Sequence, residues 1–395
     1  MKKTISLLKD NTSNTAIVLL LTALASCLLF FKISTLVPAF GPTEFKTATA
    51  VLGFSGFFNH IFFLPIELLR SILFGLIPSH GYALTRLPNI IFGLSSMVIF
   101  SYLIYTWHGR RTAVLATILF ISSAWTLHVS RLASFDVLYT FALLSLVLIN
   151  VILKKYKTSA KIFLFCGFLA GLIATIPGMI WLLIISVFML KDEISIAWQN
   201  LNKIWYKIAF TALTTYWIPL VTFSIIENGG LLKFIGAPSH FAGYWQTLKL
   251  FIAVPVHLFI RGPEYPELWL GRAPVLDVFV LLCVLLGIYF YFQHKEAARS
   301  KMLLVLLLSS MILVGLGGAV SLSAPIAIVY LIAATGITFL LKEWLTMFPV
   351  NPLARVLGIS LISVAVLMSS VYGIRSYFIA WPHNVVTKTI FIYKK

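Results

Sequence analysis

The sequence is divided into about eleven long apolar runs, and this division constrains the fold more than any other feature. A helix needs about 20 apolar residues to cross the hydrocarbon core of a bilayer, which is about 30 Å thick. The runs cover residues 16–33, 87–107, 113–129, 137–153, 162–176, 179–190, 208–226, 275–292, 302–316, 325–341 and 356–373. We therefore predict an all-α polytopic membrane protein with about eleven transmembrane helices.

Composition supports a membrane protein and argues against a soluble one. Of the 395 residues, 60% are hydrophobic and only 11% are charged, whereas a soluble domain carries about 25% charged residues. The formal net charge is +18, but the lysines and arginines lie between the apolar runs. This arrangement is typical of topology signals and lipid headgroup contacts. No nucleic-acid partner is expected.

The distribution of positive charge predicts the orientation. With the N-terminus in the cytoplasm, more than half of the 30 lysines and arginines lie on the inner side. The short outer loop 130–136 then holds one cation, Arg131, and the short outer loop 317–324 holds none. Short loops carry the positive-inside signal. We expect a multi-pass cell-membrane protein with a cytoplasmic N-terminus and an outer C-terminus.

Two long outer segments, 34–86 and 227–274, separate some of the runs. Each contains an apolar stretch interrupted by charged residues or proline, which favours a helix lying in the membrane interface. We expect a short helix near 43–52 and the two segments packed together as one cap, because large exposed apolar patches are uncommon. Residues 1–373 form the predicted membrane-embedded domain, and 374–395 form a short outer tail.

Acidic residues near the outer face are the first candidates for chemistry. Only 12 aspartates and glutamates occur in the chain, and burying an ionisable group near a membrane is costly without a functional reason. Glu44 and Asp136 each stand at the start of a predicted helix. Both positions have a second interpretation, because an acid in the first helical turn stabilises that turn through the helix dipole.

Other outer polar residues are candidates for binding. Asn59 and His60 could hydrogen-bond a sugar hydroxyl, although no spaced partner of His60 identifies a metal site. Arg86, Arg131 and Arg261 could hold a phosphate, for which the planar guanidinium is well suited. Alternatively, such side chains extend to lipid headgroups.

The order of these motifs resembles the C-type glycosyltransferases, in particular the branch of protein O-mannosyltransferases and the aminoarabinose transferase of lipid A. The likeness is best over residues 34–190. The matching pieces are Gly41-Pro42-Thr43-Glu44, Asn59-His60 with Pro65, Thr85-Arg86-Leu87-Pro88, the loop Ser130 to Asp136 with its Arg and Asp, and the glycine-rich stretch that ends at Pro177.

The resemblance implies an inverting hexosyl- or pentosyltransferase. Its donor would be a polyprenyl-phosphate-linked sugar, and its acceptor a lipid, glycan or protein at the outer face. In this reading Glu44 is the general base, and Asp136 orients the acceptor or a divalent cation. Arg131 or Arg261 holds the phosphate, with Asn59, His60 and Arg86 in the substrate site. No other cofactor is identified.

The sequence also departs from the family pattern. Thr43 stands where the family usually has the first of two adjacent acids, and the segment before the run at 325–341 lacks an expected arginine. These differences keep a catalytically inactive relative open as an alternative. A transporter or flippase of a lipid-linked substrate is a further alternative, although we find no internal repeat of the kind that transporters often show.

Overall fold

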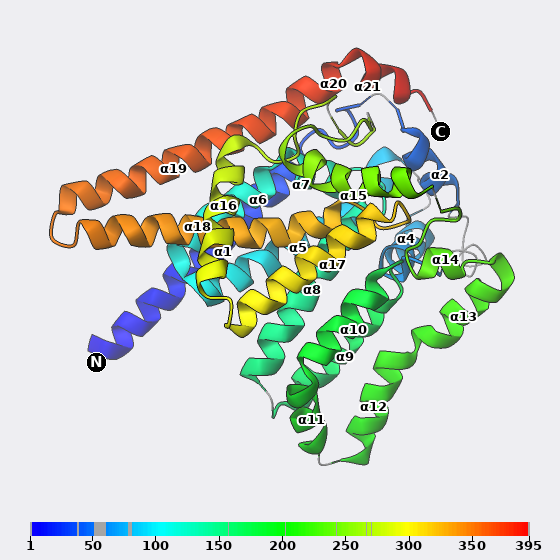
Figure 1. Cartoon of the computed structure of the whole chain (residues 1–395), viewed down its shortest axis with the longest axis horizontal. Coiled ribbons are helices and arrows are strands. Elements are labelled where there is room, and N and C mark those ends of the chain that lie inside the picture. Colours follow the sequence, from blue (N-terminus) through cyan, green and yellow to red (C-terminus); the bar gives the residue numbers. More distant parts are fainter. Residues whose placement is uncertain are drawn as a thin grey trace.

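The structure is a computed structural model that describes residues 2–37, 39–50, 61–77, 81–156, 158–201, 203–241, 243–265, 267–269 and 271–393. Within these residues every regular element is a helix, apart from an isolated antiparallel bridge between Phe40 and Tyr393. The predicted all-α membrane fold is therefore confirmed (Figure 1).

Every one of the predicted apolar runs lies in an apolar helix. Six helices in the described residues are long and apolar enough to cross a membrane. They are α5 (Tyr82–His108), α8 (Asp136–Lys155), α12 with α13 (Ile204–Thr215, Trp217–Asn228), α17 (Ala298–Gly315), α18 (Ser323–Met347) and α19 (Pro352–Arg375). A further span is broken: α6 (Arg110–Ser122) and α7 (Ala124–Arg131) are bent by 61°.

The remaining runs form shorter helices. They are the apolar part of α1 (Lys2–Phe30), α9 (Ala160–Ala174), α10 (Met179–Met189) and α16 (Val278–Gln293). At 1.5 Å per residue, α10 is only about 16 Å long, roughly half the thickness of a hydrocarbon core. A run of apolar residues thus marks a membrane helix without showing that the helix crosses the whole bilayer.

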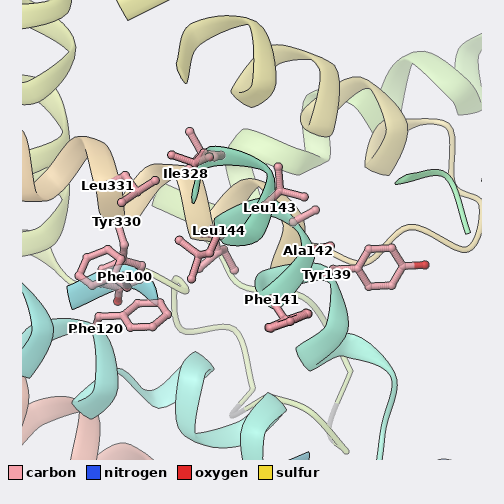
Figure 2. Packing of buried hydrophobic residues seen from close by; sticks show 14 of the residues in the cluster. Phe100, Phe120, Tyr139, Phe141, Ala142, Leu143, Leu144, Ile328, Tyr330 and Leu331 are labelled. Carbon is pink, nitrogen blue, oxygen red and sulfur yellow. The ribbon is translucent and has the colours of Figure 1, made fainter. Parts of the chain in front are cut away.

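The core of the bundle forms around α8 and α18. Their most apolar windows are 83% and 89% buried, so these two helices face protein on nearly all sides. Figure 2 shows their side chains interlocked with those of α5 and α6, including the stacked pair Phe100 and Phe120 and the neighbouring Tyr330. Helix α16 packs closely on α18 because Gly287 and Gly336 leave no side chain between the two backbones.

The helix ends gather at two faces of the bundle (Figure 1). One face holds the N-terminus, the turn between α18 and α19, and α11 (Lys191–Gln199). The other face holds both long segments and the tail, which we call the cap. Its elements are α2 (Pro42–Ala50), α4 (Leu64–Leu76), α14 (Leu231–Phe234), α15 (Tyr244–Phe259), η2 (Ser376–Ala380), α20 (Trp381–His383) and α21 (Val385–Ile390).

The cap is one packed unit, as the sequence predicted for the two long segments. The ring of Phe62 in the first segment lies 6.4 Å from that of Phe234 in the second. The side chain of Glu267 accepts a hydrogen bond of 2.9 Å from the amide of Thr43. The tail joins them through the backbone bridge to Phe40. Residues 51–60, which include part of the predicted interfacial helix, lie outside the described residues.

Cysteine labelling tests which face lies outside the cell. Gly243 and Thr389 are exposed at the cap, whereas Asn200 and Thr346 are exposed at the opposite face. In a background without native cysteines, a membrane-impermeant maleimide added to intact cells should label cysteine at Gly243 or Thr389 only, because the positive charge favours an outer cap. Labelling only at Asn200 and Thr346 would reverse the orientation, and equal labelling of all four would contradict the two-face arrangement.

Candidate active site

A buried ion pair stands at the centre of the cap. Glu44, in the first turn of α2, is only 1% exposed. Arg86, in the first turns of α5, donates from Nε to Oε1 of Glu44 at 2.9 Å and from Nη2 to Oε2 at 2.8 Å. The backbone amide of Ala133 also donates to Oε1, at 2.9 Å. Such a bidentate arginine–carboxylate pair is among the strongest hydrogen-bonding arrangements in proteins.

The pair connects several parts of the chain. The remaining guanidinium nitrogen of Arg86, Nη1, donates to the carbonyl oxygen of Ile33 at 2.5 Å, just after α1. Ala133 belongs to the loop between α7 and α8. The first long segment, α5 and this loop are therefore held at one point. The resemblance implied that Glu44 is the general base and that Arg86 belongs to the substrate site, and in the structure the two side chains are paired.

Asp136 lies at the other end of the same loop, in the first turn of α8. It is partly exposed, and its backbone amide donates to Oγ of Ser134 at 3.4 Å. Its carboxylate makes no ion pair within the described part of the chain. Glu44 and Asp136 are thus connected through the four-residue loop 132–135: Glu44 accepts from the amide of Ala133 within it, and Asp136 directly follows it. Asp136 is the more accessible carboxylate of the two.

A second buried network holds the loop from its other side. Arg70 of α4 donates to Glu67 at 2.9 Å and to the side-chain oxygen of Asn89 at 3.4 Å. Asn89 donates in turn to the carbonyl oxygen of Ser134 at 2.6 Å. The Arg70 guanidinium also lies 5.3 Å from the ring of Phe135. Three consecutive loop residues are therefore fixed by three different elements.

Arg131 ends α7 beside this loop and is 2% exposed. Its Nη2 donates to the carbonyl oxygen of Phe31 at 2.5 Å. The rings of Tyr377 and Phe378, delivered by the π-helical turn η2, lie 5.1 and 4.7 Å from its guanidinium carbon. Its Nε and Nη1 have no hydrogen-bond partner among the described residues. Arg131 is thus a buried cation with unused donors and no carboxylate partner in the described chain.

His128 lies one turn before Arg131 and has an aromatic enclosure. Its ring is 4.6 Å from the rings of both Tyr377 and Trp381 and 5.6 Å from that of Trp269. It is 1% exposed. The sequence analysis did not single it out, because a histidine within an apolar run has no local feature that predicts such an enclosure.

Arg261 lies apart from the buried cluster. It is 46% exposed and pairs at 2.7 Å with Glu264, which also pairs with Arg272 at 3.0 Å. Exposed pairs of this kind contribute little to stability. Asn59 and His60, the two proposed sugar contacts, lie outside the described residues. Among the residues that are described, no group of three or more His, Cys, Asp or Glu side chains could hold a metal ion.

The second long segment contributes a further carboxylate, Glu267. It is 5% exposed and accepts hydrogen bonds from the amide and the hydroxyl of Thr43 at 2.9 and 2.8 Å. It also accepts one from the amide of Glu44 at 3.4 Å. Burial raises the pKa of Glu267 above its ordinary value, and the charge of Glu44 raises it further, while the hydrogen bonds from Thr43 oppose both effects.

A cavity of about 240 Å³ lies in the cap, and Tyr265 and Leu268, which flank Glu267 in the sequence, are among its lining residues. Apolar side chains of α15, of the loop 263–268 and of the turn before α18 form most of its wall, together with His257 and Tyr265. The hydroxyl of Tyr265 lies 3.3 Å from that of Thr43. Thr43, the neighbour of Glu44 along the chain, thus contacts a residue of the cavity wall.

The raised pKa of Glu267 predicts a pH dependence of stability. An acid that binds its proton more tightly in the folded state loses stability as pH rises from its ordinary pKa, about 4.5, through its raised value. The melting temperature of the purified protein should fall across this window, and Glu267→Gln should flatten the fall. Glu264→Gln, an exposed acid on the same loop, is the control. A wild-type profile that Glu267→Gln leaves unchanged would contradict the assignment.

Comparisons with known proteins concern the fold. No family model and no curated protein sequence matches this chain. The structure is similar to that of ArnT from Cupriavidus metallidurans, with a TM-score of 0.55 and 11% identity over 96% of this chain and 76% of that one. ArnT is an aminoarabinose transferase.

The Archaeoglobus fulgidus oligosaccharyltransferase is also similar. Its apo structure matches with a TM-score of 0.55 and 12% identity over 96% of this chain. The complex of that enzyme, AglB, with an inhibitory peptide and a dolichol-phosphate matches with a TM-score of 0.54 and 13% identity. The present chain spans 56% of each of these two chains. Both neighbours are C-type membrane glycosyltransferases, and this chain shares their fold.

Proposed function

We propose that this protein is a membrane glycosyltransferase that transfers a sugar from a polyprenyl-phosphate-linked donor to an acceptor at the outer face. The observation that carries the proposal is the buried Glu44–Arg86 pair, set at the cap of a fold that ArnT and the oligosaccharyltransferase share. One such neighbour is in complex with a dolichol-phosphate, and another is tethered to an acceptor peptide. These ligands support a lipid-linked donor and a separate acceptor here.

Transfer with inversion requires a base and a group that stabilises the departing phosphate. We assign the base to Glu44, whose direction Arg86 and the amide of Ala133 fix. Fixing the base within hydrogen-bond reach of the acceptor hydroxyl is the main structural requirement of general base catalysis. Asp136, at the exposed end of the same loop, orients the acceptor or a divalent cation.

Arg131 is the phosphate partner in this proposal, in preference to Arg261. As the sugar leaves, negative charge grows on the phosphate, and a buried cation stabilises it more than an exposed one does. Arg131 has two unused donors, whereas Arg261 is already paired with Glu264 at the surface. Arg86 is occupied by Glu44 and acts through it. Asn59 and His60 stay proposed sugar contacts.

A transporter or flippase of a lipid-linked substrate is the alternative function. One observation favours it: the α6–α7 span is bent by 61°, and transporters often place substrates at broken helices. The break is followed by a loop fixed by buried ion pairs, which suits a rigid site better than a moving gate. Sugar transfer by the purified protein separates the two functions.

Replacing the proposed base tests the chemistry. Glu44→Gln should lower turnover about a hundredfold to ten-thousandfold per folded molecule, the usual cost of losing a general base. The measurement is sugar transfer from a polyprenyl-phosphate donor, normalised to folded protein because the change also breaks the pair with Arg86. Asp136→Asn should show whether the second acid is needed. Glu343→Gln, an exposed acid at the opposite face, is the control. Near-normal turnover of Glu44→Gln would remove Glu44 as the base.

Replacing Arg131 tests the phosphate partner. Arg131→Gln should lower turnover about a hundredfold or more, as expected when one donor to a developing oxyanion is lost. Its affinity for the free polyprenyl phosphate should also fall. The matched control is Arg355→Gln, which lies exposed at the opposite face. If Arg131→Gln binds polyprenyl phosphate as the unmodified protein does, the phosphate lies elsewhere.

A further inference from the structure

Two carboxylates meet at the first turn of α2, although they come from segments more than two hundred residues apart. Oε1 of Glu267 accepts from the amides of both Thr43 and Glu44, and its Oε2 accepts from the Thr43 hydroxyl. The contact is so close that a Cβ at Gly41 would lie 2.3 Å from Oε1. Glycine is therefore required at position 41 to admit the Glu267 carboxylate.

The two carboxylates have different surroundings. Glu44 is paired with a cation and accepts from an amide, whereas Glu267 makes no ion pair among the described residues and is held only by neutral donors. The pKa of Glu267 is raised by burial and by the charge of Glu44. Neighbouring acids placed in unlike environments are a common basis for dividing acid and base roles.

We infer that Glu267 is a positioning residue of the active site: it holds the amides of Thr43 and Glu44 and the Thr43 hydroxyl, and thereby aims Glu44. This inference rests on the proposed transfer function. It also accounts for Thr43, where the resembling family has the first of two acids: the second long segment supplies a carboxylate to the hydroxyl and amide of that same residue.

The step that Glu267 supports is a single displacement. The acceptor oxygen forms a bond to the anomeric carbon of the sugar, and the bond from that carbon to the phosphate oxygen breaks. The bonding electrons leave with the phosphate, and the proton of the acceptor hydroxyl passes to Glu44. Glu267 supports this step by fixing the first turn of α2, from which the Glu44 side chain extends.

The first experiment is the dependence of turnover on pH for Glu267→Gln and Glu267→Asp, with Glu264→Gln as the matched control. Glutamine retains an acceptor for Thr43 but removes the charge. It should lower turnover about tenfold to a hundredfold, the range expected when a reacting group is misplaced. The fall should appear at every pH at which the unmodified protein is active, and KM for the donor should stay constant. The change Glu267→Asp retains the charge but shortens the side chain. Its turnover should lie between that of Glu267→Gln and that of the unmodified protein.

The outcomes separate this inference from the proposed function. Transfer by the unmodified protein and by Glu264→Gln, together with unchanged turnover in Glu267→Gln, would overturn the role of Glu267 and leave the function standing. A loss of folded protein with unchanged turnover per folded molecule would also overturn it, since a purely structural residue behaves in that way.

A second measurement does not depend on activity. If the two carboxylates interact, the charge of Glu44 raises the pKa of Glu267. The change Glu44→Gln removes that charge. The pH range over which ionisation of Glu267 destabilises the fold should therefore move to lower pH. The readout is the melting temperature against pH for the single changes and for the double change. Equal windows with and without Glu44 would show that the carboxylates are not coupled and would overturn the inference.

Discussion

The cap of this protein depends on one buried ion pair, Glu44 with Arg86. Removing two charges from water is costly, and only good geometry with additional hydrogen bonds compensates for it. Both conditions hold here, because the guanidinium meets the carboxylate with two nitrogens and the amide of Ala133 supplies a further donor. Loss of one partner would leave an uncompensated buried charge, which costs about 3–5 kcal/mol. The Glu44–Arg86 pair joins the first long segment, α5 and the loop between α7 and α8. It thereby sets the geometry of this loop, which leads to Asp136.

Sequence reasoning located the membrane helices because apolar length is a local property. It also located Glu44 and Asp136, since an acid after a proline–glycine break or a short loop marks a helix start, and both residues do begin helices. It could not find the partners of Glu44. Arg86 is 42 residues from Glu44 and Glu267 is 223 residues from it, and no periodicity connects such positions. The pairing of loops, and with it the second carboxylate, follows only from the folded chain.

The C-terminal tail shows a similar limit. Aromatic residues of this kind, close to basic ones, suit a membrane interface, but Tyr377 and Trp381 are 2% and 0% exposed. They cover His128 and Arg131 because η2, a π-helical turn, extends α19 onto that surface. Such turns are rare and frequently occur at functional sites. Arg131 is held between rings without a carboxylate partner among the described residues, and two of its donor nitrogens have no hydrogen-bond partner there.

The short helices α9 and α10 explain how the cap comes to sit on the bundle. Their connection is irregular, and an irregular backbone at membrane depth is tolerated only where protein satisfies its polar groups. Residues of the cap satisfy two of these polar groups. The amide of Phe63 donates to the carbonyl oxygen of Thr175 at 3.1 Å, and the amide of Gly178 donates to the carbonyl oxygen of Phe234 at 2.8 Å. Each long segment therefore bonds to the same turn. The segments that carry Glu44 and Glu267 are therefore both anchored to the turn between α9 and α10.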